Sequence, residues 1–471
     1  MHGTEKKIVQ PWQALVMIVV AIAIIFIGLK VVKCPNSITL LIDGVVMCVL
    51  ASIFGIKYND LQDDIKKTVS SMIIAILILM AVGILVGVWM LSGTVPLMIY
   101  YGMKVLTPAL FLPVVCILCT LMSTMAGTSW GTVATVGVAC MGVATGLGVP
   151  AECTAGAVVV GAIFGDKISP LSDSTVLTST ISGVELVPGV IHALRTTGPA
   201  YVVSLVFFII YGLRFQGGNV ENSENYDLIL NTVSDNFTLN PFLLLPPVAV
   251  FALILLKKPT LPTFTVGIVV AIILAMIFQG ASISDATGAM MSGYTFTTDV
   301  PIVDTILRRG GMSSMLGTIA LLIAAGVFGA PMRTAGIIDI LLSAVKKIAK
   351  TGKVMSTGVL FLHGIFFTIT GAYYVSYPVV GSMVKDMFPE YGVDRRNLMR
   401  IMLDTGTGLA PLVPWATTGV YIATTLGVSN MGFLPFAPML WLSILFSLVI
   451  SLTGFGLTKM KADDAKPEAV S

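Results

Sequence analysis

Charged side chains are scarce in this chain. Only 11% of its 471 residues are Asp, Glu, Lys or Arg, whereas 56% are hydrophobic, and the mean hydropathy is +0.95. A soluble protein of this length needs far more charge to cover its surface, so a soluble globular fold is excluded. The net charge of +3 is too small to indicate a nucleic-acid partner. The composition predicts an all-α polytopic membrane protein whose main surroundings are the lipid bilayer.

Residues that hold metals or act as nucleophiles are also few. The three histidines, His2, His192 and His363, are too scattered in sequence to form a metal cluster. Cys116 and Cys119 form a Cys-x-x-Cys pair, but no second pair or neighbouring His completes a site, so we interpret them as small membrane residues. A membrane-embedded enzyme would need a nucleophile with a base, or a metal cluster, and no such set is present. We therefore expect neither an enzyme nor a bound cofactor.

Long apolar runs recur between residues 12 and 457, and each predicts a spanning helix. The run from Trp12 to Leu29 is long for a signal peptide, so we expect it to be the first span. Lys57 to Lys67 mixes both charges and is expected to be a loop, and Leu97 to Leu106, after Pro96, is short enough to be re-entrant. The predicted spans lie near 12–29, 38–56, 68–91, 108–126, 132–148, 151–165, 198–214, 241–256, 262–279, 311–329, 354–370, 396–410 and 433–457.

Four landmarks of the first half recur in the second half, in the same order and at an offset of 239–244 residues. They are Ser70-Ser71-Met72 with Ser313-Ser314-Met315, Gly87-Val88-Trp89 with Gly326-Val327-Phe328, Gly127-Thr128-Ser129-Trp130 with Gly371-Ala372-Tyr373-Tyr374, and Ser169-Pro170-Leu171 with Ala410-Pro411-Leu412. Such a duplication, with a Pro-broken segment in each half, is typical of secondary transporters that bind at the repeat interface. The predicted organisation is N-terminal helices and loop in 1–67, a first transport repeat in 68–214, a polar linker in 215–240, a second repeat with its preceding helices in 241–458, and a polar tail in 459–471.

The segment from Gly161 to Thr178 places three charges, Asp166, Lys167 and Asp173, inside an apolar region. Each charge near the middle of a bilayer costs about 2.5–3.5 kcal/mol, so it is retained only where it is paired, hydrated or used. Pro170 disfavours helix at Ser169. Unwound backbone at membrane depth lines a cavity, where its carbonyls, hydroxyls and carboxylates can bind a small cation. The segment predicts a cation site, and the break in the second half adds Asp404.

The sequence from Gly165 to Thr175, GDKISPLSDST, resembles the signature of the NhaC-type sodium/proton antiporters of the ion transporter superfamily. The stretches Gly127–Thr132, Gly310–Met312 and Pro411–Trp415 support the resemblance, which covers nearly the whole chain. It implies a bacterial inner-membrane antiporter with inverted repeats, broken helices and re-entrant hairpins. Such a protein would exchange cytoplasmic Na⁺ for external H⁺.

The chain departs from the family pattern at two places, where negative charge is missing. Ala372 and Tyr373 stand where an acidic and amide pair is usual, and Arg333 stands where an acid usually follows a Gly-Gly-hydrophobic run. Some relatives are thought to exchange organic acids together with sodium and protons. The alternative function is therefore sodium- and proton-coupled exchange of a small carboxylate of the malate or lactate type, with Arg333 and Tyr373 as possible substrate contacts.

Antiport needs a site that holds either Na⁺ or protons, and a partly buried carboxylate can do this because the two compete for it. We expect Asp173 and Asp404, with Ser172, to bind Na⁺. The other expected ion- or substrate-binding residues are Asp166, Lys167, Ser169, Ser174, Thr175, Thr405, Ser129, Trp130 and Thr132. A homodimer is a further expectation.

Each of these residues also has a purely structural interpretation. Asp166 and Lys167 could form a pair that stabilises the broken helix or caps its half-helices, and Asp173 could cap a helix that begins near Ser174. Gly-Thr-Ser-Trp-Gly could form a close helix crossing. Arg333 could extend to the interface near Asp339. A channel remains a competing function, although duplication around a charged central site favours alternating access.

Overall fold

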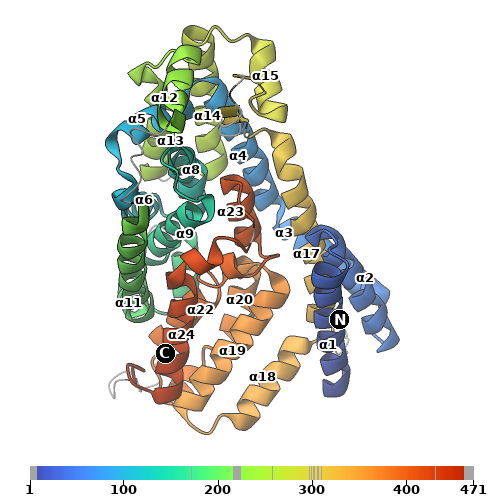
Figure 1. Cartoon of the computed structure of the whole chain (residues 1–471). Coiled ribbons are helices and arrows are strands. Elements are labelled where there is room, and N and C mark those ends of the chain that lie inside the picture. The colour runs from blue at the N-terminus through green and yellow to red at the C-terminus, as the bar shows by residue number, and fades with distance from the viewer. Residues whose placement is uncertain are drawn as a thin grey trace.

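The computed structural model describes residues 8–170, 172–215, 224–256, 258–295, 297–298, 300, 303–304, 307–308, 310–429 and 431–460. Throughout these residues the regular elements are helices, and Val393 and Lys459 form one isolated β-bridge. The prediction of an all-α fold is therefore confirmed. Figure 1 shows the helices of the two chain halves interleaved, with α9 (Ala151–Ile168), α22 (Arg396–Thr405) and α23 (Thr417–Leu426) near the centre of the molecule.

The helices up to the middle of the chain are α1 (Pro11–Phe26), α2 (Asn36–Ile53), α3 (Tyr58–Ser71), α4 (Ile73–Leu91), α5 (Thr94–Val105), α6 (Pro108–Ala126), α7 (Ser129–Thr132), α8 (Val138–Gly146), α9 (Ala151–Ile168), α10 (Asp173–Ser182) and α11 (Leu186–Gly212). Those that follow are α12 (Glu224–Asn236), α13 (Leu245–Leu255), α14 (Thr260–Phe278), α15 (Ile283–Ser292), α17 (Leu316–Thr334), α18 (Ile337–Ile348), α19 (Gly352–Thr370), α20 (Tyr373–Val384), α21 (Met387–Glu390), α22 (Arg396–Thr405), α23 (Thr417–Leu426) and α24 (Pro438–Thr453). A π-helical turn, Val133–Gly137, joins α7 to α8.

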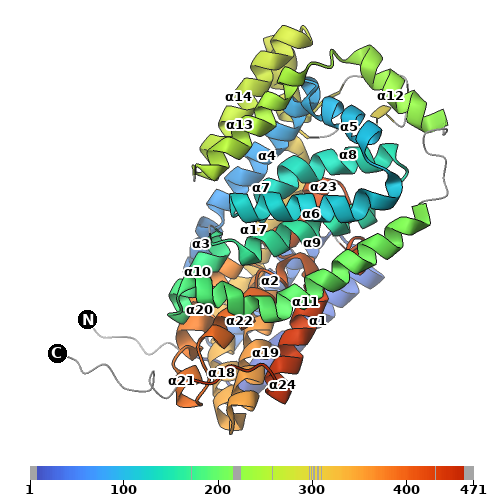
Figure 2. The same ribbon diagram turned by 90° about the vertical axis from the view of Figure 1, so that its left-hand side faces the viewer.

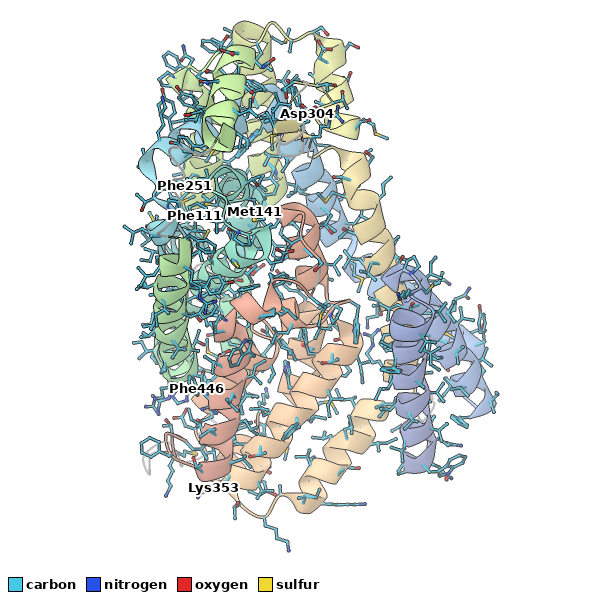
Figure 3. The ribbon with its side chains drawn as sticks, viewed as in Figure 1. Phe111, Met141, Phe251, Asp304, Lys353 and Phe446 are labelled. Atoms are coloured by element: carbon cyan, nitrogen blue, oxygen red, sulfur yellow. The ribbon has the colours of Figure 1, made fainter. Side chains whose placement is uncertain are left out.

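Five helices of the described chain, α6, α11, α14, α17 and α19, are long and apolar enough to cross a membrane. Three further pairs pass the same test together but are bent at a short break: α4 with α5 by 69°, α9 with α10 by 42°, and α12 with α13 by 101°. Asp304 and Lys353 lie toward opposite ends of the molecule, whereas Phe111 and Met141 lie between them (Figure 3). The chain is a multi-pass membrane protein, and the bend after α4 matches the expected short interrupted segment.

Several boundaries differ from the sequence prediction. The predicted loop from Lys57 to Lys67 is wrong, because these residues form most of α3, an amphipathic helix that packs against α17. The range predicted as a polar linker contains α12. The span predicted near 396–410 ends at Thr405, where Gly406 leaves helical geometry. Apolar length alone does not locate these ends, since local caps and tertiary packing decide them.

The two halves repeat the same succession of elements. The 19-residue helices α4 and α17 begin 243 residues apart, and each is followed by a left-handed glycine, Gly93 or Gly336, and a 12-residue helix. The helices α6 and α19 both end at a left-handed glycine, Gly127 or Gly371, at an offset of 244. The 10-residue helices α10 and α23 share that offset. This agreement of element lengths supports the duplication predicted from the sequence.

The crossing of α6 and α9 holds the charged end of α9 in place. A Cβ atom added at Gly161 would lie 2.3 Å from the carbonyl oxygen of Cys116, and one added at Gly165 would lie 2.6 Å from that of Thr120. Glycines four residues apart therefore let the two backbones touch. Figure 2 shows α6, α9 and α11 running alongside one another, and the contacts between these helices agree. The crossing fixes Asp166, the residue after Gly165, against α6 and α7.

Candidate functional site

The break between α9 and α10 forms as the sequence predicted. α9 ends at Ile168, and Ser169, the residue before Pro170, is extended with φ −75° and ψ 125°. α10 begins at Asp173, so the residue at its N-cap position is Ser172. The alternative in which Asp173 is the N-cap residue is therefore off by one residue. Asp173 instead accepts a 2.7 Å hydrogen bond from the backbone N–H of Ser174.

Asp166 is buried and is surrounded by hydroxyl groups. Its Oδ2 accepts a hydrogen bond from Ser129 at 2.9 Å, and its Oδ1 accepts one from Ser172 at 2.5 Å. Ser172 lies 3.0 Å from the hydroxyl of Ser174. Among the described residues, no basic side chain forms an ion pair with Asp166. A buried carboxylate with neutral oxygen neighbours can hold a small cation or a proton.

Asp173 is a second carboxylate close to the first, but it is exposed. Its Oδ2 accepts a hydrogen bond from the Tyr374 hydroxyl, which in turn accepts one from Tyr373 at 3.1 Å. Through the backbone and hydroxyl of Ser174, Asp173 is linked to Ser172 and so to Asp166. The structure thus places an exposed and a buried carboxylate on one hydrogen-bonded path.

Lys167 and Asp404 form an ion pair of 2.6 Å, and both side chains are completely buried. Asp404 also accepts hydrogen bonds from Thr196 at 2.8 Å and Thr197 at 3.5 Å, both on α11. The pair joins α9 to α22 across 237 residues of sequence. The alternative in which Lys167 pairs with Asp166 is wrong, because consecutive helical residues point in different directions. Asp404, expected as a cation ligand, bonds to Lys167 in this structure.

Thr405, the other expected residue of the second break, lies beside His363. Its hydroxyl is 2.7 Å from Nδ1 of His363 and donates at 2.7 Å to the carbonyl oxygen of Ile401. His363 stacks on Tyr377 with 5.5 Å between the ring centroids, and the Tyr377 hydroxyl lies 2.7 Å from that of Thr407. His363 is therefore packed and hydrogen-bonded.

Ser129 is the member of the Gly127–Thr132 stretch whose hydrogen bond reaches the buried carboxylate. Trp130 stacks on Tyr421 with 4.4 Å between the ring centroids, and Thr132 donates to the carbonyl oxygen of Thr128. Two hydroxyls of the break also bond to backbone: Ser169 donates to Thr124, and Thr175 donates to the carbonyl of Asp166. Ser169 and Thr175 therefore shape the break, while the hydroxyls of Ser129 and Ser172 bond to the carboxylate of Asp166 and that of Ser174 lies next to Ser172.

A cavity of about 410 Å³ adjoins the exposed end of this path. It is lined by Tyr374, whose hydroxyl bonds to Asp173, and by side chains of α3, α17, α18 and α20. Three of the lining residues are charged: Lys67 is exposed, whereas Asp64 and Asp339 are half-buried. The cavity therefore reaches Tyr374, which bonds to Asp173.

Arg333 also lines this cavity, where it is already paired. Its guanidinium lies 2.9 Å from a carboxylate oxygen of Asp64 and donates a further hydrogen bond to Thr68. Thr334 donates to Asp64 at 2.8 Å. The partner of Arg333 is thus Asp64 on α3 rather than Asp339, and this contact was hidden by the incorrect prediction of a loop there.

Sequence reasoning missed four residues that the structure brings to these sites: Tyr374, Thr196, Thr197 and Asp64. Tyr374 was within the recurring Gly371–Tyr374 landmark, so its position in the repeat was an available signal. The adjacent hydroxyls of Thr196 and Thr197, inside an apolar run, were a weaker one. No local pattern indicated Asp64, because its partner is 269 residues away.

A duplicated helical membrane fold with paired carboxylates at a break in a helix has the construction of a secondary transporter. Comparison with known proteins narrows this class. The model of the Na⁺/H⁺ antiporter family matches residues 2–192 and 186–455, so the chain belongs to that family. This confirms the resemblance to the NhaC-type antiporters, and it makes the chain a transporter rather than an enzyme.

Two relatives illustrate the range of the family. The chain is 35% identical over 437 residues to the malate-2H⁺/Na⁺-lactate antiporter of Bacillus subtilis, covering 92% of each protein. It is 34% identical over 447 residues to the Na⁺/H⁺ antiporter NhaC of Alkalihalophilus pseudofirmus, covering 94% of this chain and 96% of the relative.

Proposed function

We propose that this protein exchanges cytoplasmic Na⁺ for external H⁺ across the bacterial inner membrane, with Asp166 and Asp173 as the carboxylates that bind them. The observation that carries the proposal is the setting of Asp166. It is buried and bonded to two serine hydroxyls, and it is linked to the exposed Asp173, which bonds to Tyr374 at the edge of a cavity. Oxygen ligands of this kind suit a small hard cation.

Exchange follows from competition at one carboxylate. Bound Na⁺ favours the ionised form, and a proton on the same oxygen removes the negative charge that holds Na⁺. The ion pair of Lys167 with Asp404 supports this arrangement. Because Asp404 holds the ammonium group of Lys167, that charge does not neutralise the adjacent Asp166. We propose this role for Asp404 in the state described here.

The duplication supports alternating access, in which the two halves rock around the central breaks. We propose that the repeats have inverted membrane topology. We propose that the cavity lined by Tyr374, whose hydroxyl bonds to Asp173, opens to one side of the membrane in the described state. The opposite state would connect the carboxylates with the other side.

The test is acridine-orange dequenching in everted vesicles from an antiporter-deficient strain, with sodium chloride as the added salt. We expect Asp166→Asn to abolish Na⁺-driven proton movement, because the amide cannot exchange a proton for Na⁺. Asp173→Asn should keep α10 while weakening the response. Asp285→Asn is the matched control, since Asp285 caps the exposed start of α15. Full exchange by Asp166→Asn would overturn the assignment.

A second candidate is coupled exchange of a small carboxylate, which is favoured by the name of the Bacillus subtilis relative. Arg333, the residue expected to contact such a substrate, already binds Asp64 and Thr68. If this function is correct, the described structure requires another cationic group for the carboxylate. Adding sodium lactate and sodium malate in the same vesicle assay separates this candidate from plain Na⁺/H⁺ exchange.

A further inference from the structure

Arg400 is a buried cation without a hydrogen-bonding partner among the described residues. It lies in the middle of α22, its side chain is completely inaccessible to solvent, and Nε and both terminal nitrogens of its guanidinium make no hydrogen bond within the described chain. The described structure contains no ion pair of Arg400 within 4.0 Å. An uncompensated charge in a protein interior is among the most unfavourable arrangements that a fold can contain. Such a group is therefore a candidate for compensation by a bound ligand.

Two hydrogen bonds between α11 and α22 define the location of Arg400. On one side of it, Nε2 of His192 lies 3.2 Å from the amide oxygen of Asn397. On the other side, Thr196 donates to Asp404 at 2.8 Å. Arg400 follows Asn397 by three residues and precedes Asp404 by four, so it lies between these two contacts along the helix interface. The site is thus adjacent to the Lys167–Asp404 pair.

Asp404 is an opposite charge that acts on Arg400, but it forms its ion pair with Lys167 instead. Asp404 is one helical turn away, but its carboxylate accepts the ammonium group of Lys167 at 2.6 Å and two threonine hydroxyls. Asn397 and Thr196 are neutral, and their polar atoms are engaged with His192 and Asp404. The interface between α11 and α22 therefore carries one excess positive charge next to the transport site.

We infer that Arg400 binds the carboxylate of a small organic anion at the interface of α11 and α22. The planar fork of guanidinium N–H donors matches the two oxygens of a carboxylate. The complete burial of Arg400 favours a compact monocarboxylate such as lactate, admitted when α22 and α11 separate during the transport cycle. This inference rests on the proposed antiport function, because it supplies the anion site that the second candidate requires. It also distinguishes Arg400 from Arg333, which already has a carboxylate partner in Asp64.

The experiment measures thermal unfolding of the purified full-length protein in detergent, titrated with sodium lactate or with sodium chloride at the same Na⁺ concentration and pH. We expect lactate to raise the unfolding temperature of the wild type more than chloride does, because a ligand that binds the folded state stabilises it. Arg400→Gln should weaken the apparent lactate affinity by at least about tenfold. Arg400→Lys should also weaken it, because Lys keeps the charge but lacks the fork.

Arg396→Gln is the matched control. It makes the same chemical change one turn earlier on the same helix, where Arg396 is bonded to Asp394 at 2.7 Å, and it should leave the lactate affinity unchanged. Should Arg400→Gln fail to fold, Arg400→Lys and the lactate response of the wild type still decide the question. An absent lactate response in the wild type, or an unchanged affinity in a folded Arg400 variant, would overturn the inference.

The vesicle assay in sodium chloride keeps this inference separate from the proposed function. Na⁺/H⁺ exchange without lactate binding would leave the proposed exchange intact and refute the role of Arg400. Arg400-dependent lactate binding together with full exchange by Asp166→Asn would support the role of Arg400 and refute the proposed role of Asp166.

Discussion

The ion pair of Lys167 with Asp404 gives the sharpest test of how the two halves are held together. Both side chains are completely buried, and the ammonium nitrogen lies 2.6 Å from the carboxylate oxygen. Replacing Lys167 with Met leaves the charge of Asp404 with two threonine donors, at 2.8 and 3.5 Å. Replacing Asp404 with Asn leaves the buried ammonium group without its counter-charge. Loss of one partner of a buried pair costs about 3–5 kcal/mol, so each single variant should lose about that much unfolding free energy.

The double variant Lys167→Met/Asp404→Asn should be far less destabilised than the sum of the singles, because neither member of the pair is left as a lone charge. We expect the two single losses together to exceed that of the double variant by at least about 3 kcal/mol. The assay is equilibrium unfolding of the purified protein in mixed detergent micelles, followed by circular dichroism.

The matched control is the ion pair of Lys66 with Asp63, which is 3.3 Å long and whose side chains are 65% and 75% exposed. The corresponding single and double variants of Lys66 and Asp63 should give a coupling free energy of about 0–1 kcal/mol, because water screens exposed charges. A coupling free energy for Lys167 and Asp404 as small as that for Lys66 and Asp63 would refute the claim that burial makes the Lys167–Asp404 pair an essential contact.

Two further predictions concern the packing around the site. Gly161→Ala places a Cβ atom 2.3 Å from the Cys116 carbonyl oxygen, so it should destabilise the protein by about 1–3 kcal/mol in the same unfolding assay. The control Gly288→Ala, with open space around its Cβ atom, should be neutral or slightly stabilising. Equal effects of the two substitutions would contradict the close crossing of α6 and α9. Arg333→Gln removes the 2.9 Å contact with the partly buried Asp64 and should cost about 1–3 kcal/mol; an unchanged stability would show that this pair does not anchor α3 to α17.

The chemistry of the central segment was largely predictable from local sequence. Pro170 removes a backbone donor and disfavours helix at Ser169, and α9 ends one residue earlier, at Ile168. The repeated glycines were also informative, because Gly127 and Gly371 both adopt the left-handed conformation that ends a helix. Such features depend on covalent geometry at one or two residues.

The helical state of residues 58–67 was less predictable. Their charges indicated a loop, yet α3 is a regular helix whose Asp64 and Thr68 bond to Arg333. An amphipathic helix obtains most of its stability from the surface against which it packs. That surface, α17, lies more than 240 residues further along the chain.

By itself, then, the sequence determined a helical membrane protein with duplicated halves, a broken helix at Pro170 and carboxylates on either side of the break. Only the tertiary structure decided which charges meet. Lys167 bonds to Asp404 rather than to the neighbouring Asp166, Arg333 bonds to Asp64, and Arg400 is left without a partner in the described chain. The physical reason is that helix periodicity fixes the direction of a side chain relative to its own helix. The identity of its partner depends on how helices from distant parts of the sequence cross.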